Sequence, residues 1–227
     1  MIYVVGKSTD RFQQLDQIRK RFLVDEELKE YNLNSKNDMY CECVALYHMW
    51  KNCDDYIVGI EHYRRNFLDI FTNKLLGKNA IEKYFLKYDV ILTYKNRDPN
   101  RENLRADLSS HIGNQGVEAM LAAIQKLYGE QDLNFFSDYL SRREKNPFNL
   151  FITRNPIMKS YASWYFRIID NLTISMPKRS YGYISEFLLG GFVEHKGFKV
   201  KEIPFIMSLG DRSRIGSLDQ AFADNYK

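Results

Sequence analysis

Short apolar runs alternate with amphipathic stretches along most of the chain. The apolar runs have the length and composition of buried strands and lie near residues 2–6, 56–60, 88–94, 148–153 and 198–206. Apolar residues spaced three and four apart predict helices near residues 12–22, 37–52, 79–87, 117–128, 132–143, 155–172 and 181–195. Because strands separated by helices are typical of α/β proteins, the pattern predicts an α/β sandwich with a largely parallel sheet.

Local signals mark several of these boundaries. Ser35 with Asp38, and Asn79 with Glu82, resemble the pairs that cap helix N-termini. Pro156 directly after Asn155 is a strong helix start. Residues 95–116 are polar and predict a long loop between the third strand and the next helix.

The composition is that of one ordinary globular domain. The chain has 227 residues, of which 44% are hydrophobic, 15% aromatic and 27% charged, and this excludes a disordered or collagen-like protein. We expect one domain over residues 1–207, followed by a polar C-terminal tail over 208–227.

The charge and cysteine content bear on partners and location. A net charge of +4 suits anionic partners such as phosphates, nucleotides or a membrane surface. The basic residues form no dense stripe, so we expect no nucleic-acid partner. Three cysteines, no segment long enough to span a bilayer and no signal-like N-terminus predict a cytoplasmic protein. Cys41-x-Cys43 lacks the second pair of a metal site and is more simply buried packing.

The end of the second predicted strand carries the richest chemistry. No P-loop, dinucleotide-binding glycine pattern, His-Glu-x-x-His or Gly-x-Ser-x-Gly occurs in the sequence. Ligands of α/β proteins bind at the carboxyl ends of strands, and here the strand continues into Glu61-His62-Tyr63-Arg64-Arg65. A histidine beside arginines suits recognition of a diphosphate. The alternative is a polar core histidine with arginines paired to surface acids.

Three further positions are weaker candidates. Lys7 follows the first strand, and the turn at residues 34–37 places Lys36 before a helix start, where anions are favoured. Glu186 lies in an aromatic, apolar helix, where a carboxylate with a raised pKa would act as a general base. The alternatives are ordinary capping for the turn and a solvent-facing glutamate.

Four sequence blocks resemble one bacterial family. The first is Asn34-x-Lys36-Asn37-x-x-Tyr40-Cys41-Glu42 and the second is Gly59-x-x-His62-Tyr63-Arg64-Arg65. Asn149-x-Phe151-Ile152 and Arg179-x-x-Gly182-x-x-x-Glu186 fit less specifically. They resemble a family long described as a domain of unknown function and found in capsule, exopolysaccharide and O-antigen gene clusters. Its characterised members are glycosyltransferases, notably galactofuranosyltransferases that use UDP-galactofuranose, and the resemblance implies a glycosyltransferase A-like, Rossmann-like fold.

The chain departs from that family at two places. Tyr31-Asn32-Leu33-Asn34 replaces a Gly-Asp-Asn-Ile-like stretch, and Phe187 stands where the resemblance implies Arg, so the donor could differ. The chain also lacks the Asp-x-Asp that usually holds Mn²⁺ or Mg²⁺ in enzymes of that fold. Either Glu61 or His62 ligates a divalent metal, with His62 the named candidate, or Arg64, Arg65 and Lys36 neutralise the leaving UDP without one.

The resemblance implies a glycosyltransferase that moves a hexose, such as galactofuranose, from a UDP-sugar to a polysaccharide or lipid-linked oligosaccharide. Its expected catalytic residues are His62, Arg64, Arg65 and Glu186, and its expected substrate-binding residues are Lys7, Asn34, Lys36, Asn37, Tyr40 and Tyr63. A basic and aromatic face over residues 19–22 would allow peripheral contact with the inner face of the membrane. The alternative function is a non-catalytic module that binds a nucleotide-sugar or carbohydrate within a polysaccharide assembly complex.

Overall fold

A central sheet with helices on both faces organises the protein. The computed structural model describes residues 1–12, 15–26, 33–98, 100–209 and 212–214. Six strands lie side by side in the order β2 (Arg19–Leu23), β1 (Ile2–Gly6), β3 (Ile57–His62), β9 (Phe151–Arg154), β6 (Val90–Thr93) and β10 (Val200–Ile203). Within this row, β9 is antiparallel to both of its neighbours and the other pairs are parallel. The predicted α/β fold with a mostly parallel sheet is confirmed.

Shorter strands extend the sheet beyond the end of β3. The chain turns sharply after β3 into β4 (Arg65–Asp69), which pairs with β5 (Lys74–Leu75) and β11 (Phe205–Leu209). β11 continues to β12 (Arg212–Arg214). A separate ribbon joins β7 (Asn96–Arg97) to β8 (Glu144–Lys145).

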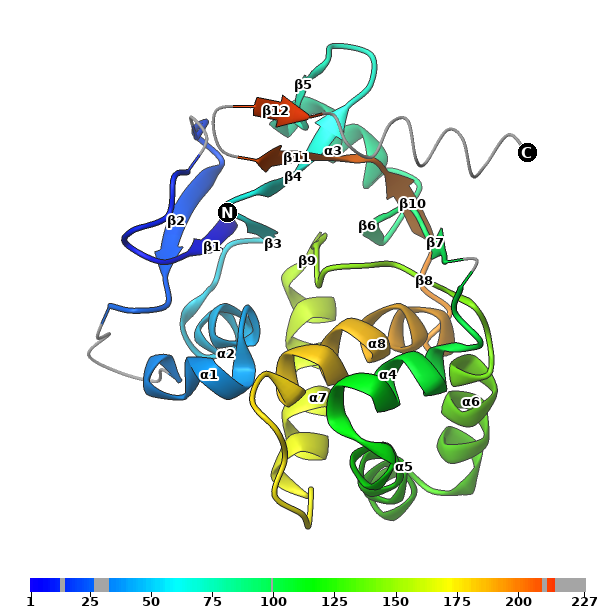
Figure 1. Cartoon of the computed structure of the whole chain (residues 1–227). Coiled ribbons are helices and arrows are strands. Elements are labelled where there is room, and N and C mark those ends of the chain that lie inside the picture. The colour runs from blue at the N-terminus through cyan, green and yellow to red at the C-terminus, as the bar shows by residue number, and fades with distance from the viewer. Residues whose placement is uncertain (13–14, 27–32, 99, 210–211, 215–227) are drawn as a thin grey trace.

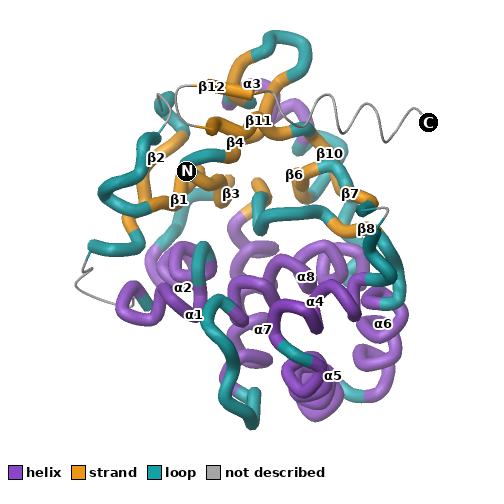
Figure 2. Tube along the Cα trace, in the orientation of Figure 1, coloured by secondary structure: helices purple, strands orange, loops and turns teal. Residues whose placement is uncertain are grey.

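Most of the helices gather on one face of the sheet, as Figures 1 and 2 show. They are α1 (Asn37–Tyr40), α2 (Cys43–Asn52), α4 (Leu104–Ile112), α5 (Asn114–Tyr128), α6 (Glu130–Leu140), α7 (Asn155–Asp170) and α8 (Ser180–His195), and a 3-10 turn (Asn34–Lys36) precedes α1. α3 (Lys78–Tyr84) lies on the opposite face. The protein has two hydrophobic cores, a larger and a smaller one, and successive residues of a strand pack into them alternately. In β6, Val90 and Leu92 belong to the larger core and Ile91 to the smaller.

The helix predicted over residues 12–22 is wrong, because residues 19–23 form β2. Ile18 and Phe22 are four residues apart but belong to different cores, on opposite faces of the sheet. The carboxylate of Glu61 binds the buried guanidinium of Arg19, and parallel pairing with β1 completes the backbone hydrogen bonds of β2. Tertiary pairing therefore overrides the local spacing.

The helix predicted over 37–52 is interrupted at Cys41. That residue has φ 50°, in the left-handed region, and it separates α1 from α2. The break packs against α8 at Gly182, where a Cβ atom would come within 2.9 Å of the Cys41 Cβ. The interruption turns Cys41 and Glu42 toward the cavity described below.

The long loop predicted over 95–116 is also wrong. It contains α4, whose Leu104, Leu108 and Ile112 are buried at four-residue spacing. The side chain of Asn103 caps α4 by accepting a hydrogen bond of 2.8 Å from the Ala106 amide. The spacing and the capping residue are both visible in the sequence, but the polar residues around them favoured a loop.

The remaining helices and strands fall near their predicted positions, with two corrections at caps. α1 begins after Lys36 and α3 after Gly77, neither with a side-chain cap, so the predicted caps at Ser35 and Asn79 are wrong. The predicted domain boundary after residue 207 lies within β11, and most of the predicted tail lies outside the described residues. No described helix is both long and apolar enough to cross a membrane.

Candidate active site

A cavity of about 230 Å³ opens at the carboxyl end of β3. Because β9 is antiparallel to β3, the residues before β9 reach the same edge of the sheet. The remaining wall comes from the break between α1 and α2 and from the first turns of α8. The lining residues are Cys41, Glu42, Arg65, Phe148, Asn149, Arg179, Gly182, Tyr183 and Glu186.

Strained backbone concentrates around this cavity. Five non-glycine residues of the described chain have positive φ, and four of them line the cavity: Cys41 at 50°, Phe148 at 75°, Asn149 at 53° and Arg179 at 66°. Each such conformation costs on the order of 1–3 kcal/mol and persists only where the surroundings enforce it. Strain of this kind clusters at functional sites, so the cavity is the part of the fold where function is expected.

Arginines supply the positive charge of the site. The Arg65 guanidinium lies 4.2 Å from the centre of the Phe148 ring, and its pKa is lowered by burial. The Nε atoms of Arg64 and Arg65 are buried and bind no acceptor among the described residues. A buried donor without a partner is costly, so the two Nε atoms are unsatisfied polar groups at the end of β3, and the Arg65 side chain lines the cavity.

His62 is neutral in this setting. Burial, together with Arg65, Arg64 and Arg179, lowers the pKa of its imidazole to about 3. Its Nδ1 accepts a hydrogen bond of 3.3 Å from the Arg64 amide, which leaves the proton on Nε2. That Nε2 lies 3.6 Å from Oε1 of Glu42.

Two carboxylates face the cavity in different surroundings. Glu186 forms an ion pair with the buried ammonium of Lys145, which also lies 4.4 Å from the Phe187 ring centre. Within the described ranges, no lysine or arginine forms such a pair with Glu42. Burial raises the pKa of the Glu42 carboxyl, Glu186 adds to this effect, and Arg65 and Arg179 oppose it.

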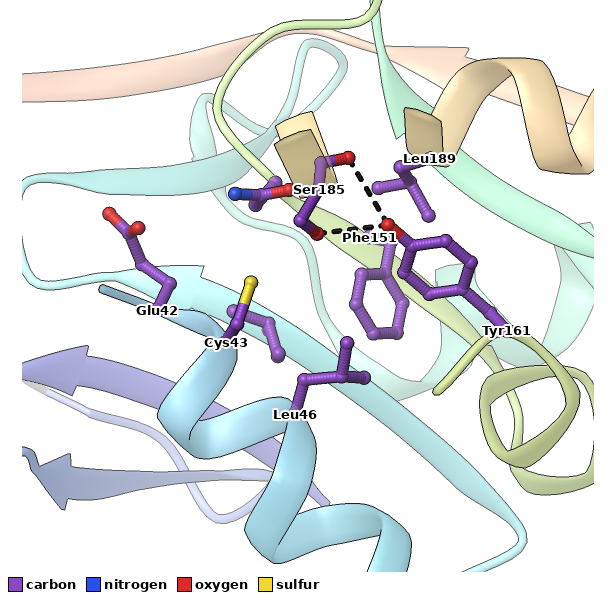
Figure 3. Close-up of a pocket in the computed structure, with 9 residues that line it drawn as sticks. Glu42, Cys43, Leu46, Phe151, Tyr161, Ser185 and Leu189 are labelled. Carbon is purple, nitrogen blue, oxygen red and sulfur yellow. Dashed lines mark hydrogen bonds between the residues drawn. The ribbon is translucent and has the colours of Figure 1, made fainter. Parts of the chain in front are cut away.

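A second, much smaller cavity of about 10 Å³ lies behind Glu42. Its far wall is apolar, formed by Leu46, Phe151, Leu189 and the Tyr161 ring, whose hydroxyl is held 2.9 Å from the Ser185 hydroxyl. Figure 3 shows the Glu42 side chain pointing away from the Tyr161 and Phe151 rings. The Glu42 carboxylate therefore lies away from this apolar wall.

The structure brings some predicted site residues together and separates others. Glu186 and Arg65 line the main cavity; His62 does not line it but lies 3.6 Å from the lining residue Glu42, and Arg64 is close enough to lower the pKa of His62. Tyr63 lies at the end of β1, close to Gly6 and the Phe12 ring, and Lys7 is exposed in the next turn. These two could meet a ligand that extends along the strand ends, and their role in binding stays a prediction.

The predicted turn at residues 34–37 lies apart from the main cavity lining. The amide of Asn34 donates to the carbonyls of Leu23 and Glu26, so it fixes the turn to the end of β2. Lys36 is exposed, and Asn37 opens α1. Tyr40 is only 7% exposed and packs edge-on against Tyr181 in the core, which explains its presence without a ligand.

Glu61 does not have the freedom that a metal ligand needs. Both of its oxygens are occupied by Arg19, the Asn66 amide and the Phe67 backbone amide, and the side chain is fully buried. Across the described residues, no group of three or more His, Cys, Asp or Glu side chains is arranged to hold a metal ion. Glu61 is therefore excluded as a metal ligand by its own hydrogen bonds, and binding of a divalent metal through His62 stays a prediction.

The predicted membrane-facing patch at residues 19–22 is wrong in two of its four members. Arg19 is buried in the ion pair with Glu61, and Phe22 is buried in the larger core. Only Lys20 and Arg21 are exposed, with their cationic groups over the rings of Tyr3 and Phe12.

Several lining residues were not predicted as site residues. Cys41, Glu42, Asn149 and Arg179 occur in the blocks that carry the family resemblance, but no local pattern gave them a role. Lys145 carried no sequence signal at all. The four blocks are distant in the sequence, but each contributes residues to the cavity wall or next to it. The blocks themselves were therefore the feature of the sequence that could have indicated these residues.

Comparison with known proteins supports the fold and establishes the family. One solved structure, described as the apo form of the bifunctional glycosyltransferase WbbM, is similar over 92% of this chain, with a TM-score of 0.79 and 23% sequence identity. The chain spans only 45% of that protein, less than half its length. No curated protein sequence gives a significant match. Residues 4–197 match the model of a domain of unknown function, DUF4422, and the chain therefore belongs to the DUF4422 family.

Proposed function

We propose that this protein is a glycosyltransferase that moves a hexose from a UDP-sugar to a saccharide acceptor. The observation that carries the proposal is Arg65, a guanidinium that lines the cavity and whose buried Nε has no partner among the described residues. It lies at the carboxyl edge of the sheet, where α/β proteins bind nucleotides. A diphosphate would supply the acceptor that this donor lacks.

The chemistry of sugar transfer explains why arginines would be placed there. As the bond between the sugar and the diphosphate breaks, negative charge accumulates on the departing UDP. Arg65 and Arg179 line the cavity, and Arg64 lies close enough to depress the pKa of His62. Fixed cations at the point where charge develops stabilise the transition state more than the ground state. This is the role that a divalent metal has in other transferases, and here the guanidinium groups carry it.

The similarity to WbbM supports the same class of reaction. That protein is described as a bifunctional glycosyltransferase, and this chain shares the fold of a part of it. The resemblance of the Asn34–Glu42 and Gly59–Arg65 blocks extends the proposal to UDP-galactofuranose as donor and to a polysaccharide or lipid-linked oligosaccharide as acceptor. Phe187, where the resemblance implies Arg, follows the lining residue Glu186 in the chain. The donor preference is the part of this proposal that depends most on this difference from the family.

A transfer assay tests the proposal. Purified protein is incubated with a panel of UDP-hexoses, including UDP-galactofuranose, and with synthetic saccharide acceptors, and the products are detected by mass spectrometry. We expect an acceptor lengthened by one hexose, formed equally in EDTA and in Mn²⁺. Arg65→Ala should lose the activity, whereas Arg167→Ala, an exposed arginine on α7 over the Tyr128 ring, should keep it. UDP binding without transfer of any sugar would favour the binding-module alternative.

A further inference from the structure

The two carboxylates of the cavity are chemically unequal. Glu186 is held by the Lys145 ammonium, whose side chain is 4% exposed. Among the described residues, no other side chain donates a hydrogen bond to the Glu42 carboxylate, which its own backbone amide reaches, and His62 Nε2 lies 3.6 Å from Oε1. Only one of the two is therefore free to accept a proton from a ligand.

Two features of the backbone direct the Glu42 side chain into the cavity. The left-handed Cys41 ends α1, and Glu42 takes the N-cap position of α2. Gly182 of α8 permits the close approach of Cys41, because a Cβ there would come within 3.0 Å of its Sγ. A strained residue and a glycine contact together direct the next side chain into the cavity, beside the arginines.

We infer that Glu42 is the general base that deprotonates the acceptor hydroxyl. The inference rests on the proposed function and assigns the base within that same site, in place of Glu186. In the step, the acceptor oxygen gives its proton to a carboxylate oxygen of Glu42 and forms a bond to the anomeric carbon of the donor. The bond from that carbon to the diphosphate breaks, and UDP leaves with the electron pair toward Arg65. A direct displacement of this kind inverts the anomeric configuration.

The charged surroundings suit the role. Glu186 is the like charge near Glu42, while Arg65 and Arg179 are the opposing charges, and His62 faces it as a neutral donor. Cys41 precedes Glu42 in the chain, Tyr183 also lines the cavity, and Lys145 is paired with Glu186. A carboxyl whose pKa is raised by burial is a stronger base than an exposed one.

Matched substitutions of the two glutamates test the assignment. Glu42→Gln should lower kcat about 10²–10⁴-fold, the usual contribution of a general base, with UDP affinity and melting temperature close to wild type. Glu42→Asp keeps a carboxylate at a shorter reach and should lose less. Glu186→Gln removes the counter-ion of the buried Lys145 and should lower the melting temperature, so kcat is compared per folded protein; it should stay within about tenfold, and the acidic limb of the pH–rate profile should move to lower pH, because a like charge is removed from Glu42. Glu82→Gln on α3 is the surface control.

Three results would overturn the inference, and sugar transfer by the wild-type chain separates a wrong base from a wrong proposed function. If Glu42→Gln transfers sugar at the wild-type rate while Glu186→Gln does not, Glu186 is the base and the proposed function stands. If the wild-type chain binds UDP but transfers no sugar to any acceptor, the proposed function fails and the base assignment fails with it. Retention of the anomeric configuration in the product would also contradict the inferred step.

Discussion

Arg19 and Glu61 form an ion pair in the interior of the protein, with Nε of Arg19 2.7 Å from Oε2 of Glu61 and Nη2 2.9 Å from Oε1. Both side chains are fully buried. The remaining capacity of Glu61 is taken by the Asn66 amide and the Phe67 backbone amide, and Arg19 also donates to the Leu76 carbonyl. The pair joins β2, β3 and β4 directly beneath the strand end that carries His62 and Arg65.

Removing one partner of this pair should be strongly destabilising. Glu61→Gln removes the buried counter-ion of Arg19 and leaves the guanidinium with the partly exposed Asp16, and breaking a buried pair costs about 3–5 kcal/mol in the free energy of unfolding. The control is Asp16→Asn, because Asp16 contacts Arg19 at 2.6 Å but is 40% exposed. That change should cost less than about 1 kcal/mol. Urea unfolding followed by circular dichroism measures both, and equal small losses would contradict this account.

The close contact at Gly182 gives a second prediction. A Cβ on that residue would lie 2.9 Å from the Cys41 Cβ and 3.3 Å from the Tyr40 carbonyl oxygen. Gly182→Ala should therefore force α8 away from the break between α1 and α2, at a cost of about 1–3 kcal/mol, and should lower transfer activity. Gly77→Ala meets no atom within 4 Å and should be neutral or slightly stabilising. Thermal melts of the two variants make the comparison, and an unchanged Gly182→Ala protein would show that the contact relaxes freely.

His62 should make stability depend on pH. Burial lowers the pKa of its imidazole from 6.5 to about 3 in the folded protein. Between these values the unfolded chain binds a proton that the native chain excludes. Stability should therefore be complete above pH 6.5 and fall as the pH is lowered toward 3, by up to about 1.4 kcal/mol per pH unit from this residue.

The substitution His62→Asn isolates that contribution. Asn keeps an acceptor near the Arg64 amide but does not titrate, so the stability difference between wild type and variant should shrink as the pH falls from 6.5 to 4.5. Denaturant titrations at several pH values give this difference directly. A difference that stays constant, or grows on acidification, would mean that His62 is protonated in the folded protein.

Much of the sheet could be predicted from the sequence, because several of its strands are marked by a local run of apolar residues. Residues 2–6, 56–60 and 88–94 are short apolar runs, and the structure places β1, β3 and β6 there. β2 could not be predicted in this way, because what fixes it is a counter-ion 42 residues away in β3. Helix α4 lies in a polar segment that suggested a loop. The four-residue spacing of Leu104, Leu108 and Ile112 indicated this helix and could have been used to predict it.

The residues of the site also differ in how far the sequence predicts them. His62, Arg64 and Arg65 follow a predicted strand, so their position at the carboxyl edge could be inferred from topology. Glu42 could not, since its orientation depends on the left-handed Cys41 and on a glycine of α8. The ion pair of Lys145 with Glu186 joins β8 to α8 and has no local signature. Residues that act through tertiary contacts are those that the sequence alone leaves unassigned.

Calorimetric titration with UDP and with uridine tests most directly whether the cavity recognises a diphosphate. The account predicts that the wild-type chain binds UDP at least about tenfold more tightly than uridine, because charge-assisted hydrogen bonds to the diphosphate contribute about 1.5–3 kcal/mol each. Arg65→Ala should abolish that preference, and Arg167→Ala should preserve it. Equal affinity for the two ligands in the wild-type chain, or an undiminished preference for UDP in Arg65→Ala, would contradict the assignment of this cavity as a UDP-sugar site.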